Sequence, residues 1–451
     1  MVTKAIAYDL VIVGSGTAAM TAAMRVRKAG WTVAMIDFRP FGGTCALRGC
    51  DPKRMLGAAS EALNFAALMK GQGVLGDLAI DWSALMAFKR SFTDSVPQST
   101  LKRLAENAID SFHGTAHFID EHRLDVDGTV VAGKHFLIAT GAEPVALNIP
   151  GEDLLVTHEE FLELPHLPGR IVFVGGGYIA AEFSHIAARA GAQVSIVHRG
   201  KQMLDRFEPE PVGWLMEKFA ELGISVHTDT AVQGIEKASS GLVVRSVRDG
   251  RAVDMEADLV VHAAGRMPAI RDLKVENAGI RVEEGRVVLN EFLQSVSQPR
   301  VYAAGDSAEV GPPLTPVSSR DATVVATNLL SGNSMKPNYE GVPSVVFTAP
   351  PLASVGLTEA KAKEQGLHFR INSRKASDWF TARRVAEPVY GFKVLIEEDT
   401  DRILGAHLVG PGVDEVINLF ALAIRNHLTS QAVADTVFAY PTGASDVSYM
   451  L

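Results

Sequence analysis

Two segments of this chain repeat one pattern: a short apolar run, a turn of small residues and a stretch of helix length. The first apolar run is Tyr8–Val13 and the second is residues 171–174. Such runs predict parallel strands buried on both faces. The small residues let a phosphate approach the backbone where the helix starts; they are Gly14, Gly16 and Ala19 in the first segment and Gly175, Gly177 and Ala180 in the second. The sequence therefore predicts two dinucleotide-binding units.

The residues after the second strand of each unit differ in charge. Asp37 stands there in the first unit, where an acid binds ribose hydroxyls. The second unit has Arg199 and Lys201, and cations at this place suit a ribose 2′-phosphate, which favours NADPH over NADH. The alternative is that both cations decorate a solvated turn. Two units imply two nucleotides, which we expect to be a bound flavin and an exchangeable hydride donor.

Cys45 and Cys50 are the only two cysteines among 451 residues. One interpretation is that they are small, buried and unreactive; the other is that they form a reactive pair. The net charge of -9 argues against a nucleic-acid partner, and no apolar run reaches the roughly 18 residues of a membrane span. We therefore expect a cytoplasmic protein, in which a close cysteine pair is more typical of catalysis than of structural crosslinking.

Three further turns follow apolar strands, at residues 140–141, 265–266 and 305–306. The first, Thr140 and Gly141, is typical of a chain that passes close to a ligand. At the second, Gly265 precedes Arg266, which we expect near the phosphates of the nicotinamide nucleotide. At the third, Gly305 precedes Asp306, which either binds the ribityl chain of a flavin or caps a helix.

Helical patterns are predicted over residues 52–71 and 82–108. After residue 337 strands give way to helices, which predicts an α+β domain; its apolar helix at 416–424 is either core or a dimer surface. We predict an α/β protein with two Rossmann-like dinucleotide-binding domains and a C-terminal α+β dimerisation domain. The FAD-binding domain spans 1–148 and 269–337, the NAD(P)H-binding domain 149–268, and the dimerisation domain 338–451.

With these motifs in place, the chain resembles the pyridine nucleotide-disulfide oxidoreductase family, the group of glutathione reductase, dihydrolipoyl dehydrogenase and mercuric reductase. The resemblance covers nearly the whole chain and rests on both glycine turns, on GGTCALRGC, and on ATG, AAGRMP, AAGDSAE with LTPV, and PPLASVGLTE. It implies a homodimer with bound FAD. NADPH reduces the flavin, and the flavin reduces a disulfide between Cys45 and Cys50.

The resemblance also implies residue roles. Cys50 is the thiol against the flavin ring, where it forms the charge-transfer thiolate, and Cys45 is the outer thiol that meets the substrate. Lys53 lies beside the flavin ring, Glu182 pairs with it, and Tyr178 gates the nicotinamide pocket. Further cofactor contacts are implied at Gly43, Thr44, Ile179, Arg199, Lys201 and Thr315.

The C-terminal region departs from the family pattern. Tyr440 stands where most members have the histidine that serves the outer thiol as acid and base, and Ser445 stands in place of its glutamate. A phenol with a pKa near ~10 is a poor base at neutral pH, whereas an imidazole near ~6.5 is a good one. We hypothesise that Arg48 lowers the pKa of a neighbouring thiol instead.

We therefore expect an NADPH-dependent FAD enzyme that reduces a small-molecule acceptor, which is a quinone, a metal ion or an unusual disulfide. The alternatives are an orthodox disulfide reductase with Tyr440, Asp446 or water as the base, a mercuric-reductase-like metal reductase, and a non-catalytic flavin redox sensor. Mercury reduction is disfavoured because capture of a soft metal uses several thiolates, and the sequence holds two cysteines.

Overall fold

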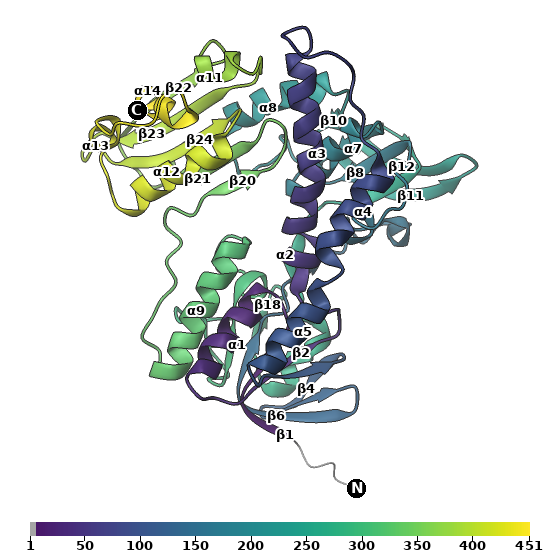
Figure 1. The fold of residues 1–451 in the computed structure, drawn as a ribbon. Helices are drawn as coiled ribbons and strands as arrows, with labels where there is room; N and C mark the ends of the chain where they lie inside the picture. The colour runs from purple at the N-terminus through teal and green to yellow at the C-terminus, as the bar shows by residue number, and fades with distance from the viewer. Residues whose placement is uncertain (1–5) are drawn as a thin grey trace. The chain divides into compact units, whose positions relative to one another are not determined.

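The computed structural model describes residues 6–451, whose helices and strands form two compact units (Figure 1). The first unit combines the described residues of Met1–Pro52 with Arg90–Val145 and Arg266–Tyr339, and the second combines Lys53–Lys89, Ala146–Gly265 and Glu340–Leu451. Both units mix helices with sheets, which confirms the α/β class. The four-segment domain division stays a prediction. Within residues 6–451, no helix has the length and apolar character needed to cross a membrane.

A seven-stranded sheet forms the centre of the first unit, in the order β3-β2-β1-β6-β5-β4 with β19 beside β6. Its strands are β1 (Ile6–Val13), β2 (Val33–Asp37), β3 (Asp110–His113), β4 (Ala116–Asp120), β5 (Arg123–Val126), β6 (Thr129–Ile138) and β19 (Val301–Ala303). The strand β1 pairs in parallel with β2 and β6. Its last four residues are all buried, as the apolar run predicted.

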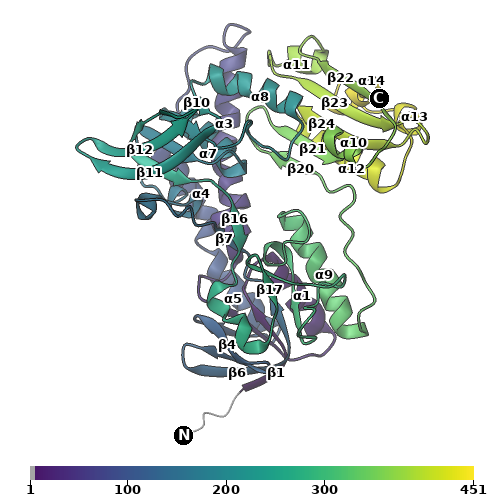
Figure 2. The same cartoon turned by 180° about the vertical axis from the view of Figure 1, so that it is seen from behind.

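Helices α1 (Thr17–Lys28) and α9 (Thr315–Ser331) lie side by side in the first unit, as Figures 1 and 2 both show. The buried face of α1 consists of Ala18, Ala19, Ala22, Ala23 and Val26. These small side chains allow a close approach to the sheet. The unit also contains α2 (Gly43–Arg48), α5 (Val96–Glu106), and the strand pairs β7 (Ala142–Pro144) with β16 (Arg266–Pro268) and β17 (Val282–Glu283) with β18 (Arg286–Val287).

The second unit contains a parallel sheet, β10-β9-β8-β15, and an antiparallel one around β11 and β12. Their strands are β8 (Arg170–Val174), β9 (Gln193–Val197), β10 (Ser225–His227), β11 (Thr230–Ala238), β12 (Gly241–Arg248), β13 (Arg251–Ala252), β14 (Met255–Ala257) and β15 (Leu259–His262). The second unit also contains most of α3 (Cys50–Met69), from Lys53 on, and most of α4 (Trp82–Thr93), up to Lys89. Its other helices are α6 (His158–Phe161), α7 (Tyr178–Arg189) and α8 (Pro209–Glu221). The succession of β8, α7 and β9 is the second predicted dinucleotide unit.

A five-stranded antiparallel sheet ends the second unit, in the order β20-β21-β24-β23-β22. It comprises β20 (Ser344–Val346), β21 (Leu352–Gly356), β22 (Phe369–Lys375), β23 (Gly391–Glu397) and β24 (Ile403–Val409), with helices α10 (Glu359–Glu364), α11 (Phe380–Arg383), α12 (Val413–Arg425), α13 (Ser430–Ala434) and α14 (Val447–Met450). One face of α12, including Ile417 and Phe420, is buried in this core, while Leu422 is 60% exposed. The predicted apolar helix is therefore core along most of its length.

The helix predicted over residues 82–108 is wrong as a single element. The chain forms α4 up to Thr93 and starts α5 at Val96. Pro97 lies in the first turn of α5, where its missing N–H costs nothing and its fixed φ suits a helix start. The apolar spacing is similar in both helices, so hydrophobic periodicity alone did not show the break.

Candidate functional site

The glycine turn of the first unit presents an open helix N-terminus. Gly14 has φ of +109°, and a Cβ atom there would lie 2.1 Å from the carbonyl oxygen of Ala139. Helix α1, with Ala19 buried in its first turns, begins after Gly16 without a side-chain cap. The Oγ1 atom of Thr140 is buried without a hydrogen-bond partner among the described residues. Unpaired donors at a helix start suit a pyrophosphate, so these residues fit the adenine dinucleotide part of FAD.

The cysteine loop packs directly on this turn. Gly43 has φ of +74°, and a Cβ atom there would lie 2.3 Å from the Cα of Gly16. The Ser15 hydroxyl donates to Oδ2 of Asp37 at 2.6 Å and accepts from the Gly42 N–H at 3.1 Å. Ser15 thus joins the predicted ribose ligand to the cysteine loop. Sequence reasoning missed Ser15, although a polar residue between the two glycines was a usable signal.

The two cysteines lie in the first unit, Cys45 within α2 and Cys50 at the start of α3, and neither forms a disulfide within residues 6–451. Cys50 Sγ lies 3.3 Å from the Thr315 hydroxyl at the first residue of α9. Between the thiols, Gly49 approaches Thr44 so closely that a Cβ atom would lie 3.0 Å from the Thr44 carbonyl oxygen. Thr315 was predicted as a cofactor contact, and its hydroxyl lies against the thiol pair.

The surroundings of Cys45 disfavour its thiolate form. A hydrogen bond with Cys50 and burial raise the pKa of Cys45 far above its ordinary value, and a hydrogen bond with Thr315 opposes them. The charge of Asp51 raises it further. Burial also raises the pKa of Asp51. These influences disfavour a thiolate at Cys45, and the family resemblance implies that Cys50 is the thiolate of the pair.

Lys53 and Glu182 form an ion pair within the second unit, between α3 and α7. The Glu182 side chain is 1% exposed and that of Lys53 is 19% exposed. Glu182 Oε1 also accepts the Phe347 N–H at 2.8 Å, and the Lys53 ammonium lies 5.8 Å from the Phe347 ring centre. Sequence reasoning missed Phe347. The buried carboxylate therefore has the Phe347 N–H at one oxygen and the Lys53 ammonium at the other, which fixes the ammonium in place.

The second glycine turn repeats the first. Gly175 has φ of +126°, and a Cβ atom there would lie 2.0 Å from the Ala263 carbonyl oxygen. Helix α7 begins after Gly177 without a side-chain cap, so its first N–H groups at Tyr178 and Ile179 suit a second dinucleotide. Burial raises the pKa of Tyr178, and the Tyr178 ring packs 5.6 Å from that of Phe207. Arg199 and Lys201, after β9, are both exposed.

Arg266 lies in the first unit, in β16 beside β7. Its place near the phosphates of the nicotinamide nucleotide stays a prediction. Its guanidinium donates to the carbonyl oxygen of Ala142. Its preceding residue Gly265 has φ of +119° and Gly141 has φ of +72°. Burial raises the pKa of Asp306, against a lowering by the Arg266 charge. Asp306 lies inside a 3₁₀ turn that has no side-chain cap, so the cap interpretation is wrong.

Tyr440 is 79% exposed at the surface of the second unit. The Ser445 hydroxyl donates to the Thr442 carbonyl oxygen at 2.6 Å, and Asp446 accepts a hydrogen bond from Tyr390 at 2.7 Å. Asp446 is therefore already used within its own domain. The proposed influence of Arg48 on a thiol stays a prediction.

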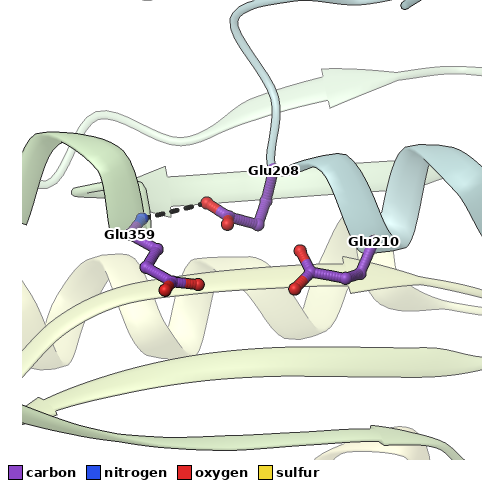
Figure 3. A group of neighbouring side chains, drawn as sticks. All are labelled: Glu208, Glu210 and Glu359. Carbon is purple, nitrogen blue, oxygen red and sulfur yellow. Dashed lines mark hydrogen bonds between the residues drawn. The ribbon is translucent and has the colours of Figure 1, made fainter.

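Three carboxylates, of Glu208, Glu210 and Glu359, converge in the second unit (Figure 3). The Lys393 ammonium, 2% exposed, donates to all three, at 2.8, 2.7 and 2.5 Å. Burial lowers the pKa of Lys393, but these hydrogen bonds outweigh it and raise the pKa above its ordinary value. The cluster already holds its cation and is a structural ion pair network.

Residues 8–322 match the family model described as "Pyridine nucleotide-disulphide oxidoreductase", and residues 342–450 match the dimerisation domain of the same group. A mercuric reductase of Staphylococcus aureus is 33% identical, covering 97% of this chain and 80% of that protein. A glutathione reductase of Burkholderia cepacia is 31% identical, covering 97% of each. The Cu(II) complex of RclA, an HOCl-induced flavoprotein disulfide reductase of Escherichia coli, is 27% identical, with a TM-score of 0.87 over 98% of both chains.

Proposed function

Because the chain belongs to the pyridine nucleotide-disulphide oxidoreductase family, and is therefore a flavoprotein oxidoreductase, we propose that it carries electrons from NADPH through FAD and the Cys45–Cys50 pair to Cu(II). Family membership implies FAD and NAD(P)H, and the dimerisation-domain match supports a homodimer. The observation that carries the proposal is the contact between Cys50 of the thiol pair and the Thr315 hydroxyl, in a chain that has Tyr440 where most family members have a histidine.

The missing histidine favours a metal ion over a disulfide acceptor. Reduction of a disulfide substrate releases a thiolate that must gain a proton, and general acid help is worth roughly 100-fold to 10,000-fold in rate. Reduction of Cu(II) releases no such group. The Cys50 thiolate and the Cys45 thiol give two electrons to two Cu(II) ions, yielding two Cu(I) ions, one disulfide and one proton, which passes to water. Thiolates are also ligands that Cu(I) prefers.

The relatives support the same acceptor class. Mercuric reductases of three organisms match this chain at 30–33% identity over 97% of its length. RclA has been solved as a Cu(II) complex, both as the natural protein and as a cysteine-to-serine mutant. For this chain we take the metal ion as substrate.

Each site residue has a defined part in this reaction. FAD, when bound, supplies a two-electron carrier between the nicotinamide and the thiols. Lys53, fixed by Glu182, places a cation where negative charge develops. Cys50 holds the thiolate, which the Thr315 hydroxyl stabilises at 3.3 Å. Cys45 holds the proton until the acceptor draws its electrons.

We assign NADPH as the donor on the two exposed cations after β9. Replacing Arg199 with Leu removes a charged hydrogen bond to the 2′-phosphate, which is worth about 1.5–3 kcal/mol, so the KM for NADPH rises roughly 10-fold to 100-fold. The KM for NADH should stay constant, because NADH lacks this phosphate. Equal changes in both KM values would contradict the assignment, and Arg248→Leu, on β12, is the control.

The acceptor is tested with purified FAD-loaded protein under anaerobic conditions. NADPH oxidation is followed with Cu(II), a quinone or glutathione disulfide as acceptor. We expect Cu(II) turnover that falls at least ~100-fold in Cys45→Ser, and slow glutathione disulfide turnover. Faster turnover with glutathione disulfide than with Cu(II) would favour the orthodox disulfide reductase. Quinone turnover that persists in Cys45→Ser would mean that quinones take electrons without the thiols.

A further inference from the structure

Asp321 is a buried carboxyl group of the first unit that the reaction above does not use. It lies on α9, two turns after Thr315, with a side chain that is 1% exposed. Its Oδ2 atom accepts the Gly305 N–H at 3.2 Å, and its Oδ1 atom accepts the Tyr339 hydroxyl at 2.9 Å. One carboxylate therefore joins two segments that lie far apart in the sequence.

The first of these segments is the turn that carries Asp306. Gly305 has φ of +69° and lies so close to α9 that a Cβ atom there would be 2.7 Å from the Ser318 hydroxyl. The turn has no side-chain cap of its own. The Asp321 carboxylate is thus the side-chain acceptor that holds the Gly305 N–H against α9.

The second segment contains Tyr339, whose ring lies next to the loop between this turn and α9. The Tyr339 ring lies over Gly311, where a Cβ atom would be 2.4 Å from the ring. The loop beneath the ring runs from Asp306 to Thr315, the residue in contact with Cys50. The hydrogen bond from the Tyr339 hydroxyl to Asp321 orients the ring, and the ring packs against Gly311 of this loop.

We propose that Asp321, as a carboxylate, is a positioning residue that holds the Gly305–Asp306 turn in its flavin-binding conformation, so that protonation of Asp321 weakens FAD retention. The inference rests on the assignment of Asp306 to the flavin. As a carboxylate, Asp321 offers an acceptor oxygen to each donor. Once protonated, Asp321 loses its charge, so the hydrogen bond from the Gly305 N–H changes from a charge-assisted one to a weaker neutral one, and the Tyr339 hydroxyl must turn from donor to acceptor.

The surroundings set where this protonation occurs. Burial and the nearby Asp306 charge raise the pKa of Asp321, hydrogen bonds from Tyr339 and Gly305 oppose them, and the net result is a pKa of about 6. The charge of Arg266 lowers the pKa of Asp306, and the charge of Glu309 raises it. The folded protein therefore takes up this proton on mild acidification, before ordinary carboxylates do.

The test measures FAD release from diluted holoenzyme by flavin fluorescence, between about pH 5 and about pH 8. We expect the wild-type FAD dissociation constant to rise roughly tenfold on acidification. Asp321→Asn should bind FAD weakly and lose most of this pH dependence, whereas Tyr339→Phe should bind weakly and keep it. Asp110→Asn removes another tyrosine–aspartate hydrogen bond of the same unit, to Tyr8 at 2.7 Å, and should behave as wild type.

Wild-type affinity and pH dependence in Asp321→Asn would overturn the inference. Tyr339→Phe provides a second, milder test if Asp321→Asn fails to fold, and unchanged affinity there would overturn it too. Asp306→Ala separates the premise from the inference. Normal FAD binding by Asp306→Ala would remove both, whereas impaired binding beside a normal Asp321→Asn would remove the role of Asp321 alone. Cu(II) is absent from these measurements, so their outcome is independent of the acceptor.

Discussion

At the residue scale, the reactivity of the thiol pair depends on which of the two sulfur atoms carries the proton. Hydrogen bonding to Cys50 and burial keep the proton on Cys45, and Thr315 supports the pair through its hydroxyl. A site of this kind provides a thiolate at Cys50 without a neighbouring imidazole. By the family resemblance, Tyr440 replaces the histidine that would give a proton to a leaving thiolate, and our proposal of a metal acceptor over a disulfide acceptor rests on this replacement.

The charge of Asp51 shifts the pKa of Cys45, and the direction of this shift can be tested. Asp51 raises the pKa of Cys45, so Asp51→Asn should lower it and let the thiolate form at lower pH. Alkylation of Cys45 in the reduced protein by iodoacetamide at neutral pH, followed on the Cys45 peptide by mass spectrometry, should then quicken several-fold. Asp81→Asn, which changes the carboxylate at the start of α4, is the control. Slower or unchanged alkylation of Asp51→Asn would contradict the electrostatic account.

The residues that sequence reasoning missed share one property: their partners lie far along the chain. Ser15 meets Asp37 and Gly42, and Asp321 meets Gly305 and Tyr339. Spacing within a motif cannot show such contacts, because they exist only after the sheet has assembled. Lys53 and Glu182 were predicted as a pair only because the family resemblance supplied the pairing.

At the element scale, the glycine turns were predictable because they are local. A strand, a turn with positive φ and a helix follow one another within about twenty residues, and each leaves its own sequence signal. The break between α4 and α5 was missed because the apolar pattern continues across it. Pro97 nevertheless favours the start of a new helix.

The contact between the cysteine loop and the glycine turn should not tolerate a Cβ atom. In Gly43→Ala this atom would meet the Gly16 backbone at 2.3 Å, so we expect loss of bound FAD and a fall of several kcal/mol in the free energy of unfolding. Gly71→Ala is the control, because Gly71 has φ of +78° with no atom near the added carbon. That change should cost about 1 kcal/mol. Equal effects of both substitutions would mean that backbone strain alone matters.

In the ion pair between α3 and α7, Glu182 is the more deeply buried partner. Loss of Lys53 alone should therefore lower the free energy of unfolding more than loss of both charges. Lys53→Met leaves Glu182 buried and unpaired, which typically costs about 3–5 kcal/mol in chemical denaturation. The double variant Lys53→Met with Glu182→Gln removes the buried charge and should regain most of this loss. Equal stability of the single and double variants would show that Glu182 does not need its partner.

At the scale of the whole molecule, the fold and cofactor class follow from signals spread over the chain, and the family matches confirm the resemblance. The acceptor does not follow from them. Mercuric reductases, glutathione reductases and dihydrolipoyl dehydrogenases all match this chain at similar identity, from 28% to 33%. The choice among acceptors depends on a few side chains near the thiols, and the departure at Tyr440 is the one that bears on proton transfer.

The most direct test of the central claim is a single turnover with Cu(II). Enzyme reduced by one equivalent of NADPH is mixed anaerobically with Cu(II) and a chelator that reports Cu(I), and the thiols are then counted. The account predicts two Cu(I) ions per NADPH and conversion of Cys45 and Cys50 to a disulfide, with the fast phase lost in Cys45→Ser. Rapid formation of Cu(I) in Cys45→Ser at the wild-type rate would contradict it.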